Sequence, residues 1–364
     1  MSSRRKPLFT AMVASSTVPL MAALGVVTAG AAQADPSCTP NVGNTGLSAA
    51  VVASSHQVIA RRTVDATGCD IGIYIGAGVR HVAVRSVTVT GANFQGILAE
   101  KTSHVRIVHS TVTGNAFNTL DPSAPVLPGS GVQSFVSQAF AISLFGVSHA
   151  IVRDNDVTNN GRGGIGVMDN GMNDPGAITQ DPNAPLMGST HDIVIGNRIS
   201  ANYNGCAVVA ATQNLGGHLG AITIARNAIS GTGVGPNGPD IGGIVVAADP
   251  PGSSVTGATV RGNTVLDSFE GGLIVNAEAP GSFTRHVRLF GNTVSGNNIG
   301  HLEAPDTAGV VTFAADGAAN IDTRVYRNDI SDQFYGIWTR GDFPPKMWRN
   351  DIDVTAGGVP VSLG

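Results

Sequence analysis

The chain has 364 residues, which is enough for two domains of average size or for one elongated domain. Charged residues make up 13% of it and aromatic residues 5%, a composition that excludes a coiled coil and a highly charged disordered chain. The 48 glycines are about twice the usual share but lack the Gly-X-Y period of collagen, and the formal net charge of −4 shows no basic excess.

The first 34 residues have the pattern of a secretory signal peptide. Residues 4–6 are basic, residues 8–31 form an apolar stretch, and residues 32–34 read Ala-Gln-Ala, a small-residue cleavage site. The alternative is a membrane anchor, but no second apolar run of membrane-spanning length follows. We therefore predict a secreted, extracellular protein without membrane insertion once the signal peptide is removed.

Removal of this segment makes the chain more acidic. Of the 21 basic residues 18 remain against 25 acidic ones, a formal charge of about −7. Only two lysines remain, Lys101 and Lys346. A nucleic-acid-binding surface needs clustered Lys and Arg, so we expect no nucleic-acid partner.

Three cysteines follow the signal segment. Cys38 and Cys69 lie near the start of the mature chain, where they could form a disulfide or stay reduced. Cys206 lies in an apolar run and is expected to be a small buried residue. No Cys and His spacing indicates a zinc site.

The body of the chain is a repeat. One short motif recurs with an asparagine between apolar residues, and two earlier copies place Val87 and Ser110 at the same position. The intervals run from 22 to 45 residues, so the shortest would be one turn of a solenoid and the longer ones would contain insertions. The repeated asparagines are Asn155, Asn197, Asn227, Asn263, Asn292, Asn328 and Asn350.

Each repeat contains a second apolar strand after a glycine-rich turn. One repeat is too short to bury its own apolar side chains, so the coils must stack and pair as parallel strands. Alternation predicts that Ile97, Ile165, Ile244 and Ile337 point inward, whereas Leu98, Gly166, Val245 and Trp338 point outward. The corner asparagines are expected to form a hydrogen-bonded ladder. The prediction is an all-β solenoid of about ten coils.

The ends of such a solenoid need covering. We predict an amino-terminal cap over residues 35–63, with a short helix over Gly46–Ser55, followed by the solenoid domain over residues 64–364. Residues 351–364 are expected to close the far end.

This pattern resembles the right-handed parallel β-helix superfamily, the pectate-lyase-like fold, in its secreted bacterial form. The resemblance covers about residues 64–357 and implies a monomer whose partner is an extracellular polysaccharide. Lyases, hydrolases, epimerases, adhesins and binding proteins share this fold. The mature chain lacks the R-x-P-x-x-R motif of pectate lyases and the N-T-D, G-H-G and R-I-K motifs of polygalacturonases. We therefore keep three readings open: a lyase of uronic-acid glycans, a glycoside hydrolase, and a non-catalytic carbohydrate-binding or cell-envelope protein.

Two long insertions suggest where a site would lie. One follows Asn115 and runs to Gly131, and the other runs from Asp169 to Pro185. They should wall opposite sides of one sheet face and leave a groove between them, unless they are ornamental loops. Groove-facing residues expected to bind substrate are Glu100, Ser143, Phe145 and Met168.

The catalytic candidates are Arg162, Asp169, Asp174 and His191. A uronate lyase would use Arg162 or His191 as its base, with Ca²⁺ or arginine neutralising the substrate carboxylate. Glu100, Asp169 and Asp174 are the tentative Ca²⁺ ligands if there is a cofactor at all. A hydrolase would instead pair Asp169 with Asp174. The alternative for Asp169-Asn170-Gly171 is a plain turn.

Three further patterns each allow two interpretations. Acids after the later strands form an acidic ledge or are solvated loop residues: Asp249, Glu278, Asp316 and Asp342. Histidines recur six residues before the repeat position. In one interpretation they form a metal-binding or pH-sensitive ladder that loses stability near about pH 5, and in the other they occupy a corner that accepts any hydrogen-bonding turn residue, as Asp322 does. These histidines are His81, His104, His149, His191 and His286. Outward-facing aromatic residues, several coils apart, stack on sugars or pack under loops: Phe145, Phe313 and Trp338.

Overall fold

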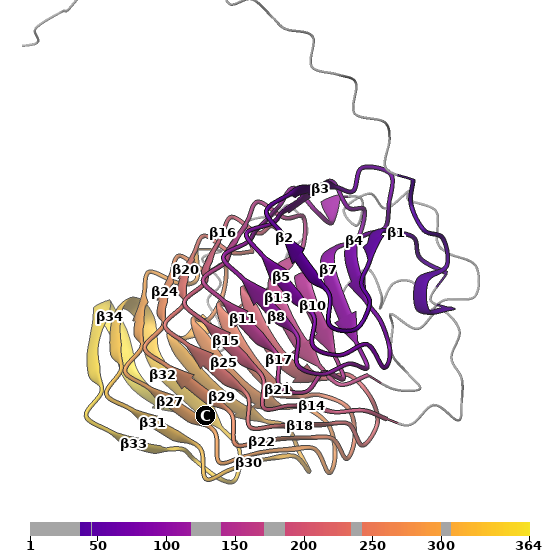
Figure 1. Ribbon diagram of the computed structural model, residues 1–364. Coiled ribbons are helices and arrows are strands. Elements are labelled where there is room, and N and C mark those ends of the chain that lie inside the picture. Colours follow the sequence, from indigo (N-terminus) through magenta and orange to yellow (C-terminus); the bar gives the residue numbers. More distant parts are fainter. Residues whose placement is uncertain (1–36, 45, 118–139, 171–185, 234–241, 300–306) are drawn as a thin grey trace, which may run out of the picture. The chain divides into compact units, whose positions relative to one another are not determined.

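Short parallel strands wind around one axis in the computed structural model, coil upon coil (Figure 1). The structure describes residues 37–44, 46–117, 140–170, 186–233, 242–299 and 307–364. The helical element with described bounds is the 3-10 turn η1 (Val42–Asn44), and Phe117 and Thr307 also have 3-10 conformation. None of the helical segments in this part of the chain has the length and apolar character that a membrane crossing requires.

Four columns of strands make the walls of the solenoid. The long-strand column carries the site described below, and its last two members also run through the second column. Its strands are β1 (Ala49–Val52), β4 (Ile71–Ile75), β7 (Gln95–Glu100), β10 (Phe140–Phe145), β13 (Gly163–Met168), β17 (Val208–Thr212), β21 (Ile244–Ala248), β25 (Leu273–Ala277), β29 (Val310–Ala314), β32 (Asp329–Arg340) and β34 (Asp351–Leu363).

The second column consists of three-residue strands before β32 and β34 join it. These are β3 (Thr63–Asp65), β6 (Thr88–Thr90), β9 (Thr111–Thr113), β12 (Asp156–Thr158), β16 (Arg198–Ser200), β20 (Ala228–Ser230), β24 (Thr264–Leu266) and β28 (Thr293–Ser295).

A ten-stranded sheet forms the third column and a five-stranded sheet the fourth. The ten strands are β2 (Val58–Ala60), β5 (Ala83–Arg85), β8 (Arg106–Val108), β11 (Ile151–Arg153), β15 (Ile193–Ile195), β19 (Thr223–Ala225), β23 (Thr259–Arg261), β27 (Arg288–Phe290), β31 (Arg324–Tyr326) and β33 (Lys346–Trp348). The five strands are β14 (Ser189–Thr190), β18 (His218–Gly220), β22 (Ser254–Thr256), β26 (Phe283–Arg285) and β30 (Ala319–Ile321).

The register of the coils confirms the predicted direction of the side chains. Ile97, Ile165, Ile244 and Ile337 all lie in one buried core cluster and are at most 1% exposed. Parallel pairing places equivalent residues over one another, as in the column Val208, Ile244, Leu273, Val310 and Ile337. The apolar side chains therefore fill a continuous column that no single coil could bury alone.

The predicted asparagine ladder is confirmed. Each Nδ2 donates to the Oδ1 of the next corner asparagine at 2.9–3.0 Å, from Asn155 to Asn350. Each also donates to a backbone carbonyl, such as Asn197 to Val152 O at 3.0 Å. A second ladder of Asn115, Asn160 and Asn202 lies five residues further along each coil and was not predicted from the sequence.

The amino-terminal end differs from the predicted cap. The helix expected over Gly46–Ser55 is wrong, because β1 lies there and pairs in parallel with β4. Leu47 is fully buried and belongs to an apolar cluster on the outer face of the long strands, so the segment gains more from sheet pairing than from a helix. A disulfide joins Cys38 to Cys69. At the other end β34 pairs with β32 as the last strand of the long-strand column.

Candidate functional site

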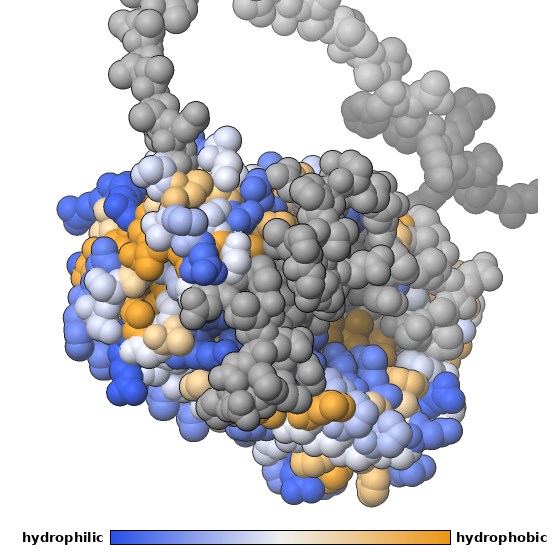
Figure 2. Space-filling model, turned by 90° about the vertical axis from the view of Figure 1, so that its right-hand side faces the viewer, coloured by the Kyte–Doolittle hydropathy of each residue, from blue (hydrophilic) through white to orange (hydrophobic). Residues whose placement is uncertain are grey.

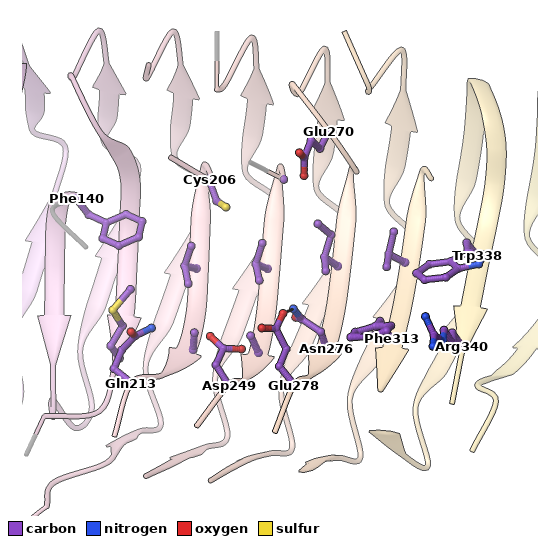
Figure 3. A pocket seen from close by; sticks show the side chains of 18 residues that line it. Phe140, Cys206, Gln213, Asp249, Glu270, Asn276, Glu278, Phe313, Trp338 and Arg340 are labelled. Carbon is purple, nitrogen blue, oxygen red and sulfur yellow. Dashed lines mark hydrogen bonds between the residues drawn. The ribbon is translucent and has the colours of Figure 1, made fainter. Parts of the chain in front are cut away.

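The outer face of the long-strand column carries a groove from β10 to β32 with a cavity volume of about 660 Å³ (Figure 3). Its floor consists of two rows of outward-facing side chains, one residue per coil, held in register by the parallel pairing. The first row is Val209, Val245, Ile274, Val311 and Trp338, and the second is Ala211, Ala247, Asn276, Phe313 and Arg340.

Two acids stand side by side at one edge of the groove. Asp249 directly follows β21 and Glu278 directly follows β25, and the pairing of Ala248 with Ala277 places them on adjacent coils. Figure 3 shows the two carboxyl groups next to each other, with Asn276 beside Glu278. The Asn276 side-chain amide donates a hydrogen bond to Glu278 Oε1. The amide thereby helps to orient the Glu278 carboxylate.

The environment of Asp249 favours its protonated form. Burial raises the pKa of Asp249 from 3.8 to about 7, and the nearby carboxylates of Glu278 and Asp169 add to the effect. Asp249 Oδ1 is buried and has no hydrogen-bond partner among the described residues. The same holds for Asn276 Oδ1. Buried acceptors of this kind are normally satisfied, so water or a ligand group is expected to bind them.

Aromatic side chains line the groove at β29 and β32. The rings of Phe313 and Trp338 stack at 6.1 Å with an interplanar angle of 11°, and the Arg340 guanidinium lies 5.7 Å from the Phe313 ring centroid. The two rings lie on adjacent coils, because Val311 pairs with Trp338, so the prediction that these aromatic residues lie several coils apart is wrong for this pair.

Comparisons with known proteins show what the chain is similar to. No protein-family model matches it, and no curated protein matches it in sequence. Among solved structures it is similar to PfbA, a surface adhesin of Streptococcus pneumoniae, with a TM-score of 0.52 and 10% identity over 79% of this chain and 64% of that one. A mutant tailspike protein of E. coli bacteriophage HK620, solved in complex with a pentasaccharide, gives a TM-score of 0.53 and 11% identity over 89% of this chain and 55% of that one.

The fold is the right-handed parallel β-helix. The expected fold class and the resemblance to the pectate-lyase-like fold are confirmed. The chain spans less than two thirds of the length of either neighbour. At 10–11% identity the likeness concerns the fold alone.

Of the four residues expected to bind substrate, one lines the groove and three are buried away from it. Met168 lines the groove. Glu100, Ser143 and Phe145 are buried, at 4%, 0% and 2% exposed, and do not line it. Glu100 accepts hydrogen bonds from the Tyr74 hydroxyl and from the Asn170 amide, and its pKa is raised by burial.

The catalytic candidates do not converge among the described residues. Arg162 precedes β13 and Asp169 follows it, a separation of about 20 Å along the strand. Arg162 is half-buried, which lowers its pKa, and Nη1 approaches Asn204 O at 3.5 Å. His191 is exposed at a distant corner of the coil, and Asp174 lies outside the described residues.

Asp169 supports the neighbouring coil. Its carboxylate accepts hydrogen bonds from the backbone N–H groups of Gln213 and Asn214 and from the Asn214 side chain at 3.0 Å. Burial raises the pKa of Asp169, and these hydrogen bonds oppose the rise. Gly217 is required nearby, because a Cβ there would lie 2.0 Å from Asp169 Oδ2. Asp169 thus fixes the turn that carries Gln213 into the groove.

Glu100 and Asp169 do not fit the tentative Ca²⁺ site. The carboxylates of Glu100 and Asp169 are engaged in the internal hydrogen bonds just described. In the described part of the chain no three His, Cys, Asp or Glu side chains are grouped so as to hold a metal ion. We therefore derive no step through calcium.

The acids after the later strands divide into two kinds. Asp249 and Glu278 line the groove, whereas Asp316 and Asp342 are exposed in turns outside it. The sequence pattern singled out all four acids and allowed both interpretations, but it did not single out Asn276 or Arg340. Cys206 was expected to be buried, but it is partly exposed and lines the groove. The period-two alternation within β25 and β32 was the signal for Asn276 and Arg340.

Proposed function

We propose that the groove binds a segment of an extracellular polysaccharide across several coils and that Asp249 and Glu278 hydrolyse a glycosidic bond within it. The observation that supports this is the acid pair: a largely buried carboxyl group that holds its proton near neutral pH beside a second, exposed carboxylate. Two carboxyl groups in different environments are what acid-base cleavage of a glycoside requires.

The rest of the groove suits sugars. The faces of aromatic rings such as Phe313 and Trp338 pack against the apolar faces of pyranose rings. The amides of Asn276 and Gln213 can exchange hydrogen bonds with sugar hydroxyls. The tailspike protein of the same fold was solved with a pentasaccharide, which supports a polysaccharide as the ligand class.

The chemistry assigned to each residue follows from its protonation. Asp249 donates its proton to the glycosidic oxygen as the bond to the anomeric carbon breaks. Glu278 assists attack on that carbon, either by taking a proton from water or by attacking directly. Asn276 holds the Glu278 carboxylate in position. On the water route, Glu278 releases the proton it took to solvent and Asp249 takes one up after the product leaves. On the direct route, Asp249 deprotonates a water molecule that cleaves the ester bond to Glu278, which frees the product and returns the proton to Asp249.

Of the two reactions left open by the sequence, hydrolysis fits the groove better than elimination. A uronate lyase needs a positive group that neutralises the substrate carboxylate and a base next to it. The described lining of the groove carries three acids, Asp249, Glu270 and Glu278, and Arg340 alone as a basic residue. A polymer with a carboxylate on every sugar would be repelled at the acid pair, whereas a neutral polymer would not.

The experiment uses the mature protein and a panel of neutral and uronic-acid polysaccharides. New reducing ends without the ultraviolet absorbance of an unsaturated uronate are expected on a neutral substrate. Asp249→Asn and Glu278→Gln should each abolish them, while Asp316→Asn, an exposed acid after the next long strand, should not. Growth of the unsaturated product, or full activity of both groove variants, would overturn the hydrolase assignment.

Non-catalytic binding is the second candidate. It is supported by the similarity to PfbA, a surface adhesin. In that case a polysaccharide of the panel would bind without any product. Substitution of Trp338 by Ala would weaken binding, and Asp249→Asn would leave it unchanged.

A further inference from the structure

A stack of five histidine rings runs along one corner of the β-helix, away from the groove residues. Successive ring centroids are 5.0, 4.6, 5.1 and 5.1 Å apart, and three of the four ring pairs lie within 15° of parallel. All five side chains are exposed. The rings stand at the turns before β2, β5, β8, β11 and β15, which Figure 1 shows as neighbouring strands. This histidine strip consists of His56, His81, His104, His149 and His191.

The backbone at this corner explains why the rings are evenly spaced, but it does not explain why the residues are histidines. Each of the five has a left-handed backbone, with φ between 57° and 64°. The backbone is held by coil-to-coil hydrogen bonds, such as His104 N to Ser148 O at 2.9 Å. Ala221 and Asp322 adopt the same conformation at later corners, so a histidine is not required for the turn. The imidazoles are therefore free to serve another purpose.

Arginines are the exposed charged residues beside the strip, whereas the adjacent acid Asp192 is buried. Arg80 precedes His81, and Arg106 on β8 follows His104 by two residues. The residues before the next three rings are Ser103, Ser148 and Thr190, which carry no charge. The acid beside the last ring, Asp192, is fully buried, and its Oδ1 accepts the Ala150 N–H at 2.7 Å.

No described carboxylate pairs with any of the five rings. Two other histidines are different: His109 lies 4.0 Å from Asp154, and His286 lies 3.0 Å from Asp322. Within the strip, desolvation, the neighbours His81 and His149, and Arg80 lower the pKa of His104. Imidazole side chains take up protons in acid, so a stack of them becomes a line of positive charges there.

We propose that the histidine strip is a second binding site, one that captures a linear anionic glycan, sulfated or phosphorylated, under acidic conditions. Protonated rings about 5 Å apart along one corner of the β-helix present a row of positive charges to a polymer that carries an anionic group on each sugar. Such a polymer would relieve the repulsion between the rings. The acid-rich groove repels the same polymer, so the two sites take ligands of opposite character.

The test measures binding of fluorescent dextran sulfate, with uncharged dextran as the control ligand, at constant ionic strength. Circular dichroism first defines the lowest pH at which the fold persists, and the acidic measurement is made there. We expect the affinity for dextran sulfate to rise at least about tenfold between pH 7.5 and that pH. Uncharged dextran should show no comparable rise.

Two variants separate the strip from general surface charge. His104→Asn combined with His149→Asn keeps residues that tolerate the left-handed turn and removes two central charges. This variant should lose most of the acid-induced gain and keep the affinity measured at pH 7.5. His109→Asn, at another corner, should keep the gain. A wild-type affinity that does not change with pH, or an equal gain in the double variant, would overturn the proposal.

Discussion

Replacing Asp249 by asparagine tests the protonation of the groove directly. The folded protein keeps the Asp249 proton up to a pKa of about 7, whereas the unfolded chain releases it near 3.8. The folded state therefore binds more protons than the unfolded state between these values. The contribution of this group to stability is fully present below about pH 4 and is lost as the pH rises through 7. Asparagine, which cannot ionise, removes that loss.

The magnitude follows from the difference between the two pKa values. A difference of about 3 corresponds to about 4 kcal/mol if the site were fully shielded from solvent. Asp249 is largely but not fully buried, so solvent screening reduces the effect. We therefore expect Asp249→Asn to be more stable than the wild type by about 1–2 kcal/mol at about pH 8.

The assay is urea unfolding of the two proteins at about pH 8 and about pH 5. The stability advantage of the variant should shrink at the lower pH, because ionisation of Asp249 stabilises the unfolded wild-type chain less there. Hydrolytic activity of the variant should be absent at both pH values. Asp316→Asn is the matched control and should show no such pH dependence, because Asp316 is exposed. An Asp249→Asn protein that is less stable than the wild type at pH 8 would refute a protonated carboxyl group at this position.

Three structural predictions can be checked by the same unfolding measurement. Asp169→Ala leaves the N–H groups of the next turn without their acceptor and should cost about 2–4 kcal/mol, and unchanged stability with lost activity would instead indicate a chemical role. Asn263→Ala interrupts the ladder at a fully bonded rung and should cost about 2–4 kcal/mol, clearly more than Asn350→Ala at its end; equal costs would contradict the ladder as a source of stability. Replacing Cys38 and Cys69 by serine removes a link across 31 residues and should cost about 3–4 kcal/mol, and unchanged stability would argue against the bond.

The fold could be predicted from the sequence because a solenoid repeats the same local structure in every coil. Each corner asparagine, such as Asn227, contacts its equivalents in the adjacent coils, so the repeat in the sequence is also the contact pattern in space. Alternation alone placed Ile165 and Ile244 in the core. The amino-terminal strand was missed because residues 49–52 have no repeat partner in the sequence and are ordered by pairing with β4.

The site was harder to predict because similar sequence positions lie in different environments. Asp249, Glu278 and Asp316 each follow a long strand within two residues, yet Asp316 points to solvent and Asp249 is largely buried. The pKa of Asp249 depends on neighbours from other coils, which no single repeat contains. Asp169 was predicted to be catalytic because its hydrogen-bond donors are not visible in its own repeat. The N–H groups that donate to its carboxylate belong to Gln213 and Asn214 in the following coil.

The proposed division into two binding sites follows from the same one-residue-per-coil geometry. A face of the β-helix is a set of columns, each with one residue per coil. On the face shown in Figure 2, hydrophobic residues lie in small patches between hydrophilic ones. The average charge of the chain does not reveal two local features. Asp249 and Glu278 place two acids side by side in the groove, and the histidine strip from His56 to His191 forms a column that can take up protons. Because a substitution in one column leaves the register of the other unchanged, the loss of groove activity and the loss of acid-dependent binding should be separable in single proteins.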